Sequence, residues 1–325
     1  MTQQKQLPDL RGQWIDLVEV QGPVQLPTRP RQMIDSYITI WQRDQQLWAG
    51  DGFGTVSADG IVNLYDQLAL YINDCILWPG QNGFNTYVRT VDLAGLWIDD
   101  QGNIHALSQL VSPVELNQTV AVIGQDREGQ LCGYLSEWVH RPSGRRLTAR
   151  LSNDCLQLQW SDGAVWKRHL DVAGEWISIK NKLHRRIESD GLKVTIGGVP
   201  GVIDPVIWYV NAVKQPFPGD KTKGGIDLDS TAIHWSDYVG WQRYFNLEGE
   251  WRDSKGASHV ISEQKLQDAT EYRRFPWQFS IDGHNHGLLI RNWVQITTKN
   301  KTLSGMVNFD SNRIDWVTGD VWCKS

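Results

Sequence analysis

The chain has 325 residues, and its 40% hydrophobic content is enough to build a substantial core without disulfide staples. Its 32 Lys and Arg and 37 Asp and Glu are mixed along the sequence, so there is no basic stripe and nucleic acid is not expected as a partner. Because no apolar run approaches the ~20 residues of a membrane helix and the first residues lack a signal-peptide pattern, we expect a cytoplasmic protein without membrane contact.

Common cofactor and metal motifs are missing from the sequence. The four cysteines are scattered without a CxxC pair, and there is no glycine-rich phosphate loop, GxSxG, HExxH or acidic calcium loop. His284 and His286 stand one residue apart in a glycine-flanked turn, but the turn offers no third ligand. We therefore expect no metal and no cofactor, which leaves binding alone or acid/base catalysis.

One motif occurs four times and predicts a repeat protein with units of about 80 residues. Each unit opens on Gly-x-Trp, and successive opening tryptophans are 83, 79 and 75 residues apart: Trp14, Trp97, Trp176 and Trp251. Each unit closes on a Trp with an aromatic residue six positions later: Trp78 and Phe84, Trp160 and Trp166, Trp235 and Trp241, Trp316 and Trp322. The sequence thus predicts one domain, 1–325, made of the repeats 9–91, 92–170, 171–245 and 246–325.

In chain order, each unit starts with a predicted hairpin, continues with a strand that holds a Trp, and ends with a second hairpin. In the second unit the opening hairpin pairs residues 95–99 with 104–109, and the closing hairpin turns at Ser161-Asp-Gly163. Turn residues recur every ~10 residues and no window shows helical periodicity. We therefore expect an all-β chain with five or six short strands in each unit.

Two architectures suit four such units. One is a closed, propeller-like ring of four β blades. The other is a pair of lipocalin-like barrels of two repeats each, because Gly-x-Trp also opens barrels of that kind. The junctions between units are short and no linker divides the chain near residue 171, which favours the four-bladed ring.

Departures from the repeat pattern indicate where function was added. Opening and closing aromatics recur in register and are interpreted as core, and the recurring His105, His184 and His259 are interpreted as structural. The mid-repeat tryptophans have divergent neighbours instead: Trp41, Trp138, Trp208 and Trp293. Residues two apart on a strand share a face, so polar partners accompany these rings: Arg43 beside Trp41, His140 beside Trp138, Arg291 and Gln295 beside Trp293.

These residues predict the wall of one asymmetric pocket. Stacked indoles would hold a flat ligand, and Arg43 or Arg291 would bind its acid group. His140 occurs in a single copy close to Glu137, so these two are the expected general acid/base residues. The alternative is a solvated groove without function.

The first unit is longer than the others between its mid-repeat and closing Trp. The separation is 37 residues from Trp41 to Trp78, against 22 from Trp138 to Trp160. Extra length in one repeat usually forms a loop on the working face. We therefore expect a mobile insertion that closes Trp48 and Phe53 over the ligand.

Its size, unexported character and Gly-x-Trp repeats without a standard enzyme motif make the chain resemble the cyclase of the scytonemin pathway, which makes a cyanobacterial sunscreen. The resemblance covers the whole chain but brings no active-site signature. It implies ring closure, with loss of carboxylate, of a β-keto acid that joins indole and phenol units, so the expected substrate is a small aromatic acid. Alternatives are a carbohydrate-binding, lectin-like repeat protein and a purely structural interaction platform. Divergent residues at matched positions speak against four equivalent sugar sites.

Overall fold

The computed structural model describes residues 7–16, 37–49, 52–64, 66–72, 75–80, 83–109, 120–124, 127–132, 135–140, 143–152, 154–205, 209–212, 223–228, 230–236, 239–266, 277–298 and 302–325. All regular structure in these residues is β, which confirms the all-β expectation. None of the described residues belongs to a helix that is long and apolar enough to cross a membrane.

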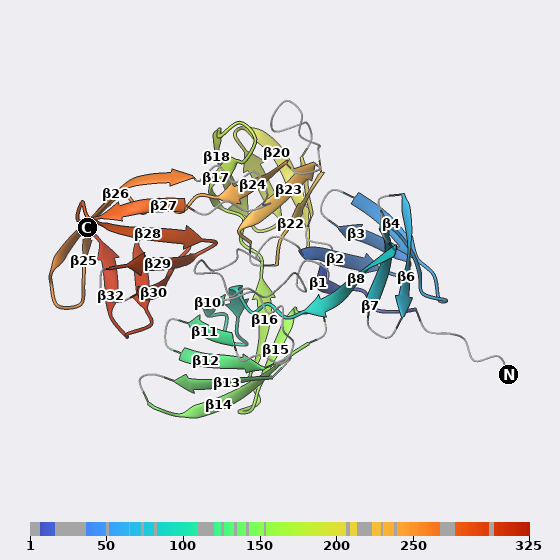
Figure 1. The fold of residues 1–325 in the computed structure, drawn as a ribbon, viewed down its shortest axis with the longest axis horizontal. Helices are drawn as coiled ribbons and strands as arrows, with labels where there is room; N and C mark the ends of the chain where they lie inside the picture. The colour runs from blue at the N-terminus through green and yellow to red at the C-terminus, as the bar shows by residue number, and fades with distance from the viewer. Residues whose placement is uncertain are drawn as a thin grey trace.

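The strands form four closed barrels of eight antiparallel strands each, seen as four bodies in Figure 1. The first barrel, at the right, consists of β1 (Gly12–Asp16), β2 (Tyr37–Arg43), β3 (Gln46–Ala49), β4 (Gly52–Val56), β5 (Ile61–Leu64), β6 (Gln67–Ile72), β7 (Cys75–Gly80) and β8 (Gly83–Thr90). The second, at the bottom, consists of β9 (Gly95–Ile98), β10 (Ile104–Gln109), β11 (Val120–Gly124), β12 (Arg127–Cys132), β13 (Leu135–His140), β14 (Arg146–Leu151), β15 (Gln157–Trp160) and β16 (Val165–His169).

The other two barrels have the same order. The third, at the top, consists of β17 (Gly174–Ser178), β18 (His184–Asp190), β19 (Lys193–Ile196), β20 (Val199–Asp204), β21 (Tyr209–Ala212), β22 (Lys223–Ile226), β23 (Ala232–Ser236) and β24 (Val239–Arg243). The fourth, at the left, consists of β25 (Gly249–Arg252), β26 (Ser258–Leu266), β27 (Trp277–Ile281), β28 (Asn285–Ile290), β29 (Trp293–Thr297), β30 (Thr302–Val307), β31 (Arg313–Trp316) and β32 (Val321–Lys324).

This topology corrects both expected architectures. Each strand pairs with the next, and the eighth pairs with the first, so every sheet closes within one of the ranges 9–91, 92–170, 171–245 and 246–325. Each unit has eight strands rather than the expected five or six, and a sheet that closes on itself leaves no exposed edge. The units are therefore neither blades of one ring nor halves of two shared barrels.

One end of each barrel is closed by its Gly-x-Trp segment. In the second barrel the buried Trp97 indole donates to the Leu93 carbonyl at 3.0 Å, and the Arg168 guanidinium lies 4.4 Å from the Trp97 ring centroid. Arg168 also donates to the carbonyls of Asp92 and Ala94, both at 2.5 Å. The cation–π contact and the charge-assisted hydrogen bonds tie the last strand to the opening segment.

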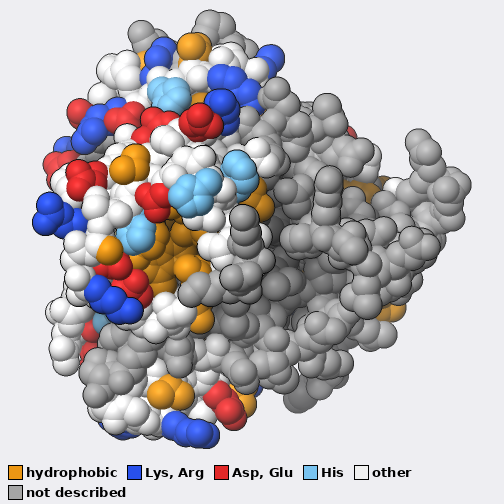
Figure 2. Space-filling view, turned by 60° about the vertical axis from the view of Figure 1, so that its left-hand side comes forward, with side chains coloured by type: hydrophobic (Ala, Val, Ile, Leu, Met, Phe, Trp, Pro, Cys, Tyr) orange, Lys and Arg blue, Asp and Glu red, His pale blue; other side chains and the backbone are white. Residues whose placement is uncertain are grey.

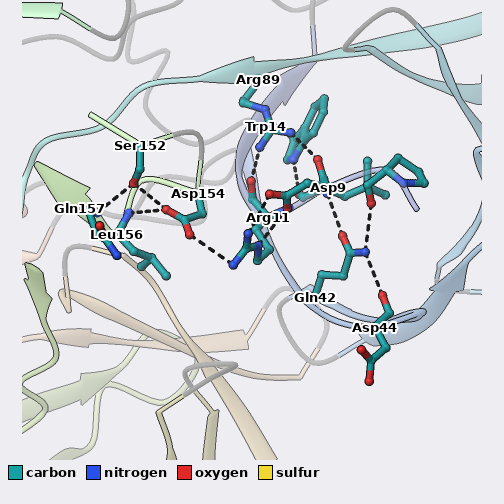
Figure 3. Close-up of polar contacts among 12 residues, drawn as sticks. Asp9, Arg11, Trp14, Gln42, Asp44, Arg89, Ser152, Asp154, Leu156 and Gln157 are labelled. Atoms are coloured by element: carbon teal, nitrogen blue, oxygen red, sulfur yellow. Dashed lines mark hydrogen bonds and ion pairs between the residues drawn. The ribbon is translucent and has the colours of Figure 1, made fainter. Parts of the chain in front are cut away.

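The same closed end recurs in the other barrels. Its Trp and basic residue are Trp14 with Arg89, Trp176 with Arg243, and Trp251 with Lys324. Figure 3 shows the first of these, where Arg89 donates to the Asp9 and Arg11 carbonyls. The opening glycines all have positive φ, as at Gly95 (121°), a conformation that a residue with a Cβ atom avoids.

The closing motif of the first unit differs from the expected one. Tyr87, rather than Phe84, stands two residues before the basic residue, and its ring centroid lies 6.0 Å from that of Trp78. The register explains this, because Ile76 pairs with Tyr87 as Leu158 pairs with Trp166 in the second barrel. A longer β7–β8 hairpin moves the aromatic residue along the chain.

Ion pairs join the outer surfaces of the barrels. Arg11 reaches Asp154 of the second barrel at 3.3 Å, as Figure 3 shows. Arg168 extends beyond its own barrel and donates to the Leu228 carbonyl of the third at 3.1 Å. One buried hydrophobic cluster contains residues of the second and third barrels together with Trp41 of the first. The barrels therefore pack against one another through defined contacts.

Candidate functional site

The mouth of the second barrel, the end opposite its closed end, is bordered by the turns at 99–103, 143–145 and 161–164. Four rings from four strands follow one another across it. Centroid distances are 5.5 Å from Trp138 to Trp160, 4.7 Å from Trp160 to Trp166, and 4.0 Å from Trp166 to His105. We call these four residues the aromatic row.

Strand alternation and register place the row inside the barrel. On β15 and β16 the buried positions alternate with exposed ones, and Trp160 and Trp166 occupy buried positions. Trp138 lies across from Gly129, where an added Cβ atom would come 2.8 Å from the Trp138 ring. Only glycine leaves this indole room to lie over β12. The Trp138 N–H donates to the Ser136 hydroxyl at 2.7 Å, which fixes its orientation.

His105 ends the row and forms a pair with Asp99. Its Nε2 lies 2.9 Å from the Asp99 carboxylate, and its ring is stacked on Trp166 with 6° between the planes. The other Asp99 oxygen accepts the backbone N–H groups of Gln101 and Asn103, so the turn holds the carboxylate in place. The hydrogen bond from His105, followed by that from the Asn103 side chain, holds the pKa of Asp99 well below its ordinary value.

His140 lies at the same mouth, whereas Glu137 does not. Residues 136, 138 and 140 of β13 share the inner face, and the His140 Nδ1 lies 2.7 Å from the Ser143 hydroxyl. Glu137 is exposed on the outer face of β13. The expected pairing of these two residues is therefore corrected by strand alternation, which points neighbours of odd spacing in opposite directions.

Arg145 follows His140 in the β13–β14 turn. The backbone N–H of His140 donates to the Arg145 carbonyl at 2.9 Å. The Arg145 guanidinium is 61% exposed and its Nη2 lies 3.9 Å from Asp162 in the β15–β16 turn. This mouth thus combines the imidazoles of His105 and His140, the Asp99 carboxylate bound to His105, and the accessible guanidinium of Arg145.

Trp41, Arg43 and Trp48 lie elsewhere. Trp41 and Trp48 pair across β2 and β3 on the outer face of the first barrel and pack against the cluster of the second and third barrels. Arg43 binds Asp204 of the third barrel at 3.1 Å. These three side chains therefore connect barrels, because an outward-facing Trp is buried only where another barrel covers it.

The candidates of the fourth barrel are also outside the second mouth. Trp293 is buried on the outer face of β29, since the adjacent Val294 belongs to the interior cluster. Arg291 binds Asp92 of the second barrel at 2.6 Å, and the Gln295 amide lies 3.5 Å from the Ser304 hydroxyl. Trp208 lies outside the described residues. Of the expected pocket-wall tryptophans that lie in the described part of the chain, only Trp138 is at this mouth.

The expected insertion of the first unit is corrected as well. Gln46–Ala49 and Gly52–Val56 are the regular barrel strands β3 and β4, and Phe53 is 78% exposed. The separation from Trp41 to Trp78 is long because Trp41 lies on the second strand of its barrel, whereas Trp138 lies on the fifth. No lid is needed to explain the spacing.

The sequence does not single out Asp99 and His105, because a histidine recurs near this place in three units. The register distinguishes the three recurring histidines: His105 pairs with Trp97 and His259 with Trp251, but His184 pairs with Ile177 and Arg185 takes the matching place. The useful signal was Asp followed by His six residues later, at Asp99 and Asp253, together with the closing Trp pair.

The fourth barrel repeats the arrangement at its mouth. His259 stacks on Trp322 at 4.0 Å with 4° between planes, and its Nε2 lies 3.6 Å from Asp253. Figure 2 turns this barrel toward the viewer and shows a hollow with a hydrophobic floor and with His and acidic side chains at its border. Within the described residues, no group of three or more His, Cys, Asp or Glu side chains is placed to hold a metal ion.

Comparisons with known proteins add little to this geometry. No protein-family model and no curated protein matches the chain. A solved structure of a protein from Lactobacillus plantarum aligns over 86% of this chain and 80% of its own, with 10% identity and a TM-score of 0.12. A likeness this weak carries no argument about fold or function.

Proposed function

We propose that the mouth of the second barrel binds a planar aromatic acid, and that the protein is a cofactor-independent cyclase acting on an indole-containing β-keto acid. The observation that carries the proposal is His105, which is held by Asp99 and stacked at the end of a row of three indoles. A carboxylate–imidazole pair is suited to proton transfer, and the neighbouring rings are suited to a flat substrate.

The proposed reaction forms one carbon–carbon bond and breaks another. Indole C2 attacks the substrate's ketone carbon while protonated His105 gives its proton to the ketone oxygen. The indole then gives its C2 proton to His105, and the carboxylate leaves as CO2 while its electron pair forms a carbon–carbon double bond to the former ketone carbon, whose hydroxyl, protonated by His140, leaves as water. Asp99 stabilises the imidazolium form of His105, and the indole faces stabilise positive charge on the attacking ring. His140, on the same inner face as Trp138, is the second proton carrier.

Arg145 takes the role expected for Arg43 and Arg291 at the substrate carboxylate. Arg43 binds Asp204 and Arg291 binds Asp92, each in a contact between two barrels. Arg145 is exposed in the turn that follows His140. A guanidinium can bind a carboxylate through two parallel hydrogen bonds, which orients the acid as well as attracting it.

Access to the row depends on His105. The three tryptophans are at most 3% exposed, whereas the His105 side chain is 21% exposed and covers Trp166. Movement of the His105 ring off Trp166, with its Nε2 still on Asp99, frees an indole face on which the substrate stacks. His105 then stands beside the substrate instead of beneath it.

Two measurements test the proposal. Indole-3-acetate, titrated against intrinsic Trp fluorescence, reports binding, and product formation from an indole-containing β-keto acid reports turnover. His105→Gln should keep binding within about threefold but lower kcat by roughly 10²–10⁴, while Arg145→Gln should raise KM. Arg185→Gln, at the matching place of the third barrel, is the control. Unchanged turnover in His105→Gln would remove the proposed acid.

Carbohydrate binding is the second candidate, and one observation favours it. The Asp, His and Trp of the second mouth recur in the fourth, as expected of a lectin with two similar sites. Selective binding of neutral sugars on a glycan panel, lost in both His105→Ala and His259→Ala, would support this function over the cyclase.

A further inference from the structure

The fourth barrel's mouth resembles the second but differs in its charges. His259 lies between two carboxylates: Nδ1 is 3.2 Å from Asp282 in the β27–β28 turn, and Nε2 is 3.6 Å from Asp253. At the second mouth, His105 forms an ion pair with Asp99 alone among the described residues. One imidazole, even protonated, cannot neutralise two carboxylates. The fourth mouth therefore attracts a ligand that brings a positive charge, whereas the second offers the exposed Arg145 to an acid.

A buried donor without a partner provides an independent observation. The Nε1–H of Trp316, on the inner face of β31, has no hydrogen-bond partner, and Trp316 is 1% exposed. A Cβ atom added at Gly305 would lie 2.9 Å from Trp316 Cε3, so this edge of the indole faces β30. Nε1 is on the opposite edge and points away from β30. A buried N–H group costs free energy until an acceptor satisfies it.

The two indoles provide a surface for an aromatic body. The ring centroids of Trp316 and Trp322 lie 4.9 Å apart, and the Trp322 N–H is held by Asp320 at 3.2 Å. His259 covers Trp322 as His105 covers Trp166. The hollow with a hydrophobic floor in Figure 2 is on this side of the molecule.

We propose that the mouth of the fourth barrel is a second ligand site, specific for an aromatic amine that carries a hydroxyl or carbonyl oxygen. The ammonium group binds Asp282 and Asp253, the ring displaces His259 from the face of Trp322 and stacks there, and the oxygen accepts the Trp316 N–H. This site takes a cation with an oxygen acceptor, and it is independent of the acid-binding function proposed for the second barrel.

A series of three ligands tests the proposal on the full-length protein. Tyramine has the amine and the oxygen, phenethylamine lacks the oxygen, and 4-hydroxyphenylacetate replaces the amine by an acid. Calorimetric titration should give one tyramine site per chain, with phenethylamine about threefold to tenfold weaker and the acid weaker still at this site. Displacement of bound tyramine by the acid at equal affinity, or no binding of tyramine, would overturn the proposal.

Variants assign the binding to its residues. Asp282→Asn should weaken tyramine at least tenfold, since a charge-assisted contact is lost. Trp316→Phe keeps a ring but removes the N–H, so it should abolish the difference between tyramine and phenethylamine. His105→Gln, at the second mouth, should leave tyramine unchanged. If Asp282→Asn binds tyramine as the original chain does, or if His105→Gln loses it, the site is not at the fourth mouth. Thermal unfolding of each variant excludes misfolding as the cause.

Discussion

The two ends of the barrels follow different rules. At the closed ends, every barrel has an opening Trp beneath a basic side chain, and every opening indole donates to the carbonyl four residues earlier. At the mouths, the residue facing the opening Trp from the second strand is His105, Arg185 or His259 in the last three barrels. The closed end is common to the four barrels, whereas the mouths differ, and both proposed binding sites lie where the copies differ.

The mouth of the third barrel lacks the Asp–His pair of the second and fourth mouths. Trp235 and Trp241 lie 5.3 Å apart, much as in the second barrel, but Ser178 and Arg185 replace the Asp and the His. The aromatic residues are thus common to these mouths, and the Asp–His pairs are additions. This makes the third barrel the natural control for variants of the other two.

Removing an opening Trp should have the largest effect. Trp97→Ala deletes a fully buried indole together with the surface on which Arg168 lies, so we expect the second barrel to lose ~3–5 kcal/mol of unfolding free energy. Denaturant unfolding measures the loss. Phe53→Ala, an exposed aromatic on the first barrel, should stay within ~0.5 kcal/mol. A Trp97→Ala loss as small as that would mean that the closed end is not the framework.

Next in size is the basic residue at the closed end, whose effect should depend on the barrel. Arg168→Met leaves the carbonyls of Asp92, Ala94 and Cys155 without their donor, at a cost of about 2–4 kcal/mol. Lys324→Met removes one hydrogen bond, to the Asn246 carbonyl, and should cost about 1 kcal/mol or less. Equal losses in the two variants would show that these hydrogen bonds do not set the difference.

The sequence predicted the parts of this comparison unevenly. The Gly-x-Trp motifs and the alternation of apolar residues were enough to predict all-β units and their buried Trp. The number of strands per unit was not, because the variable middle segments have weak turn signals. Alternation shows which residues share a face, as with Trp41 and Arg43, but not whether that face is inside its barrel or covered by another. That depends on contacts between barrels.

The site had a similar limit. Alternation predicts that Trp138 and His140 share one face, as they do, whereas Glu137 is a candidate only through its closeness to His140 in the sequence, and it lies on the outer face. The recurrence of His105 in other units predicts a structural residue, and this interpretation misses its pairing with Asp99. His105 faces Trp97, whereas His184 is one residue out of that register and Arg185 faces Trp176, a difference that sequence spacing alone does not reveal. A pattern of Asp and His in only two of four copies was the signal to follow.

Asp99→Asn should give an effect that depends on pH. The His105 hydrogen bond lowers the pKa of Asp99 in the folded state, so the folded state favours the ionised carboxylate. This stability is complete above the ordinary carboxyl pKa of about 4 and is lost as the pH falls below it. The thermal stabilities of the original chain and of Asp99→Asn should therefore differ at pH 7 and converge toward pH 2. Asp100→Asn, exposed in the same turn, is the control, and a difference that does not shrink in acid would contradict the assigned cause.

The smallest effect is expected where the barrels meet. Arg43 and Asp204 form an ion pair between the first and third barrels, but Arg43 is 46% exposed. Such a pair contributes at most ~1 kcal/mol, and salt screens it. Arg43→Gln should therefore lower the unfolding midpoint slightly at low ionic strength and not at all in 0.5 M salt, a concentration at which the Debye length is only about 4 Å.

Arg291→Gln is the matched comparison, because Arg291 is 11% exposed and lies 2.6 Å from the buried Asp92. Its loss should persist in salt, since water and ions do not reach the pair it breaks. If both losses disappeared in salt, the contact at Asp92 would be as open as the one at Asp204, and the outer faces of the second and fourth barrels would not be held together there.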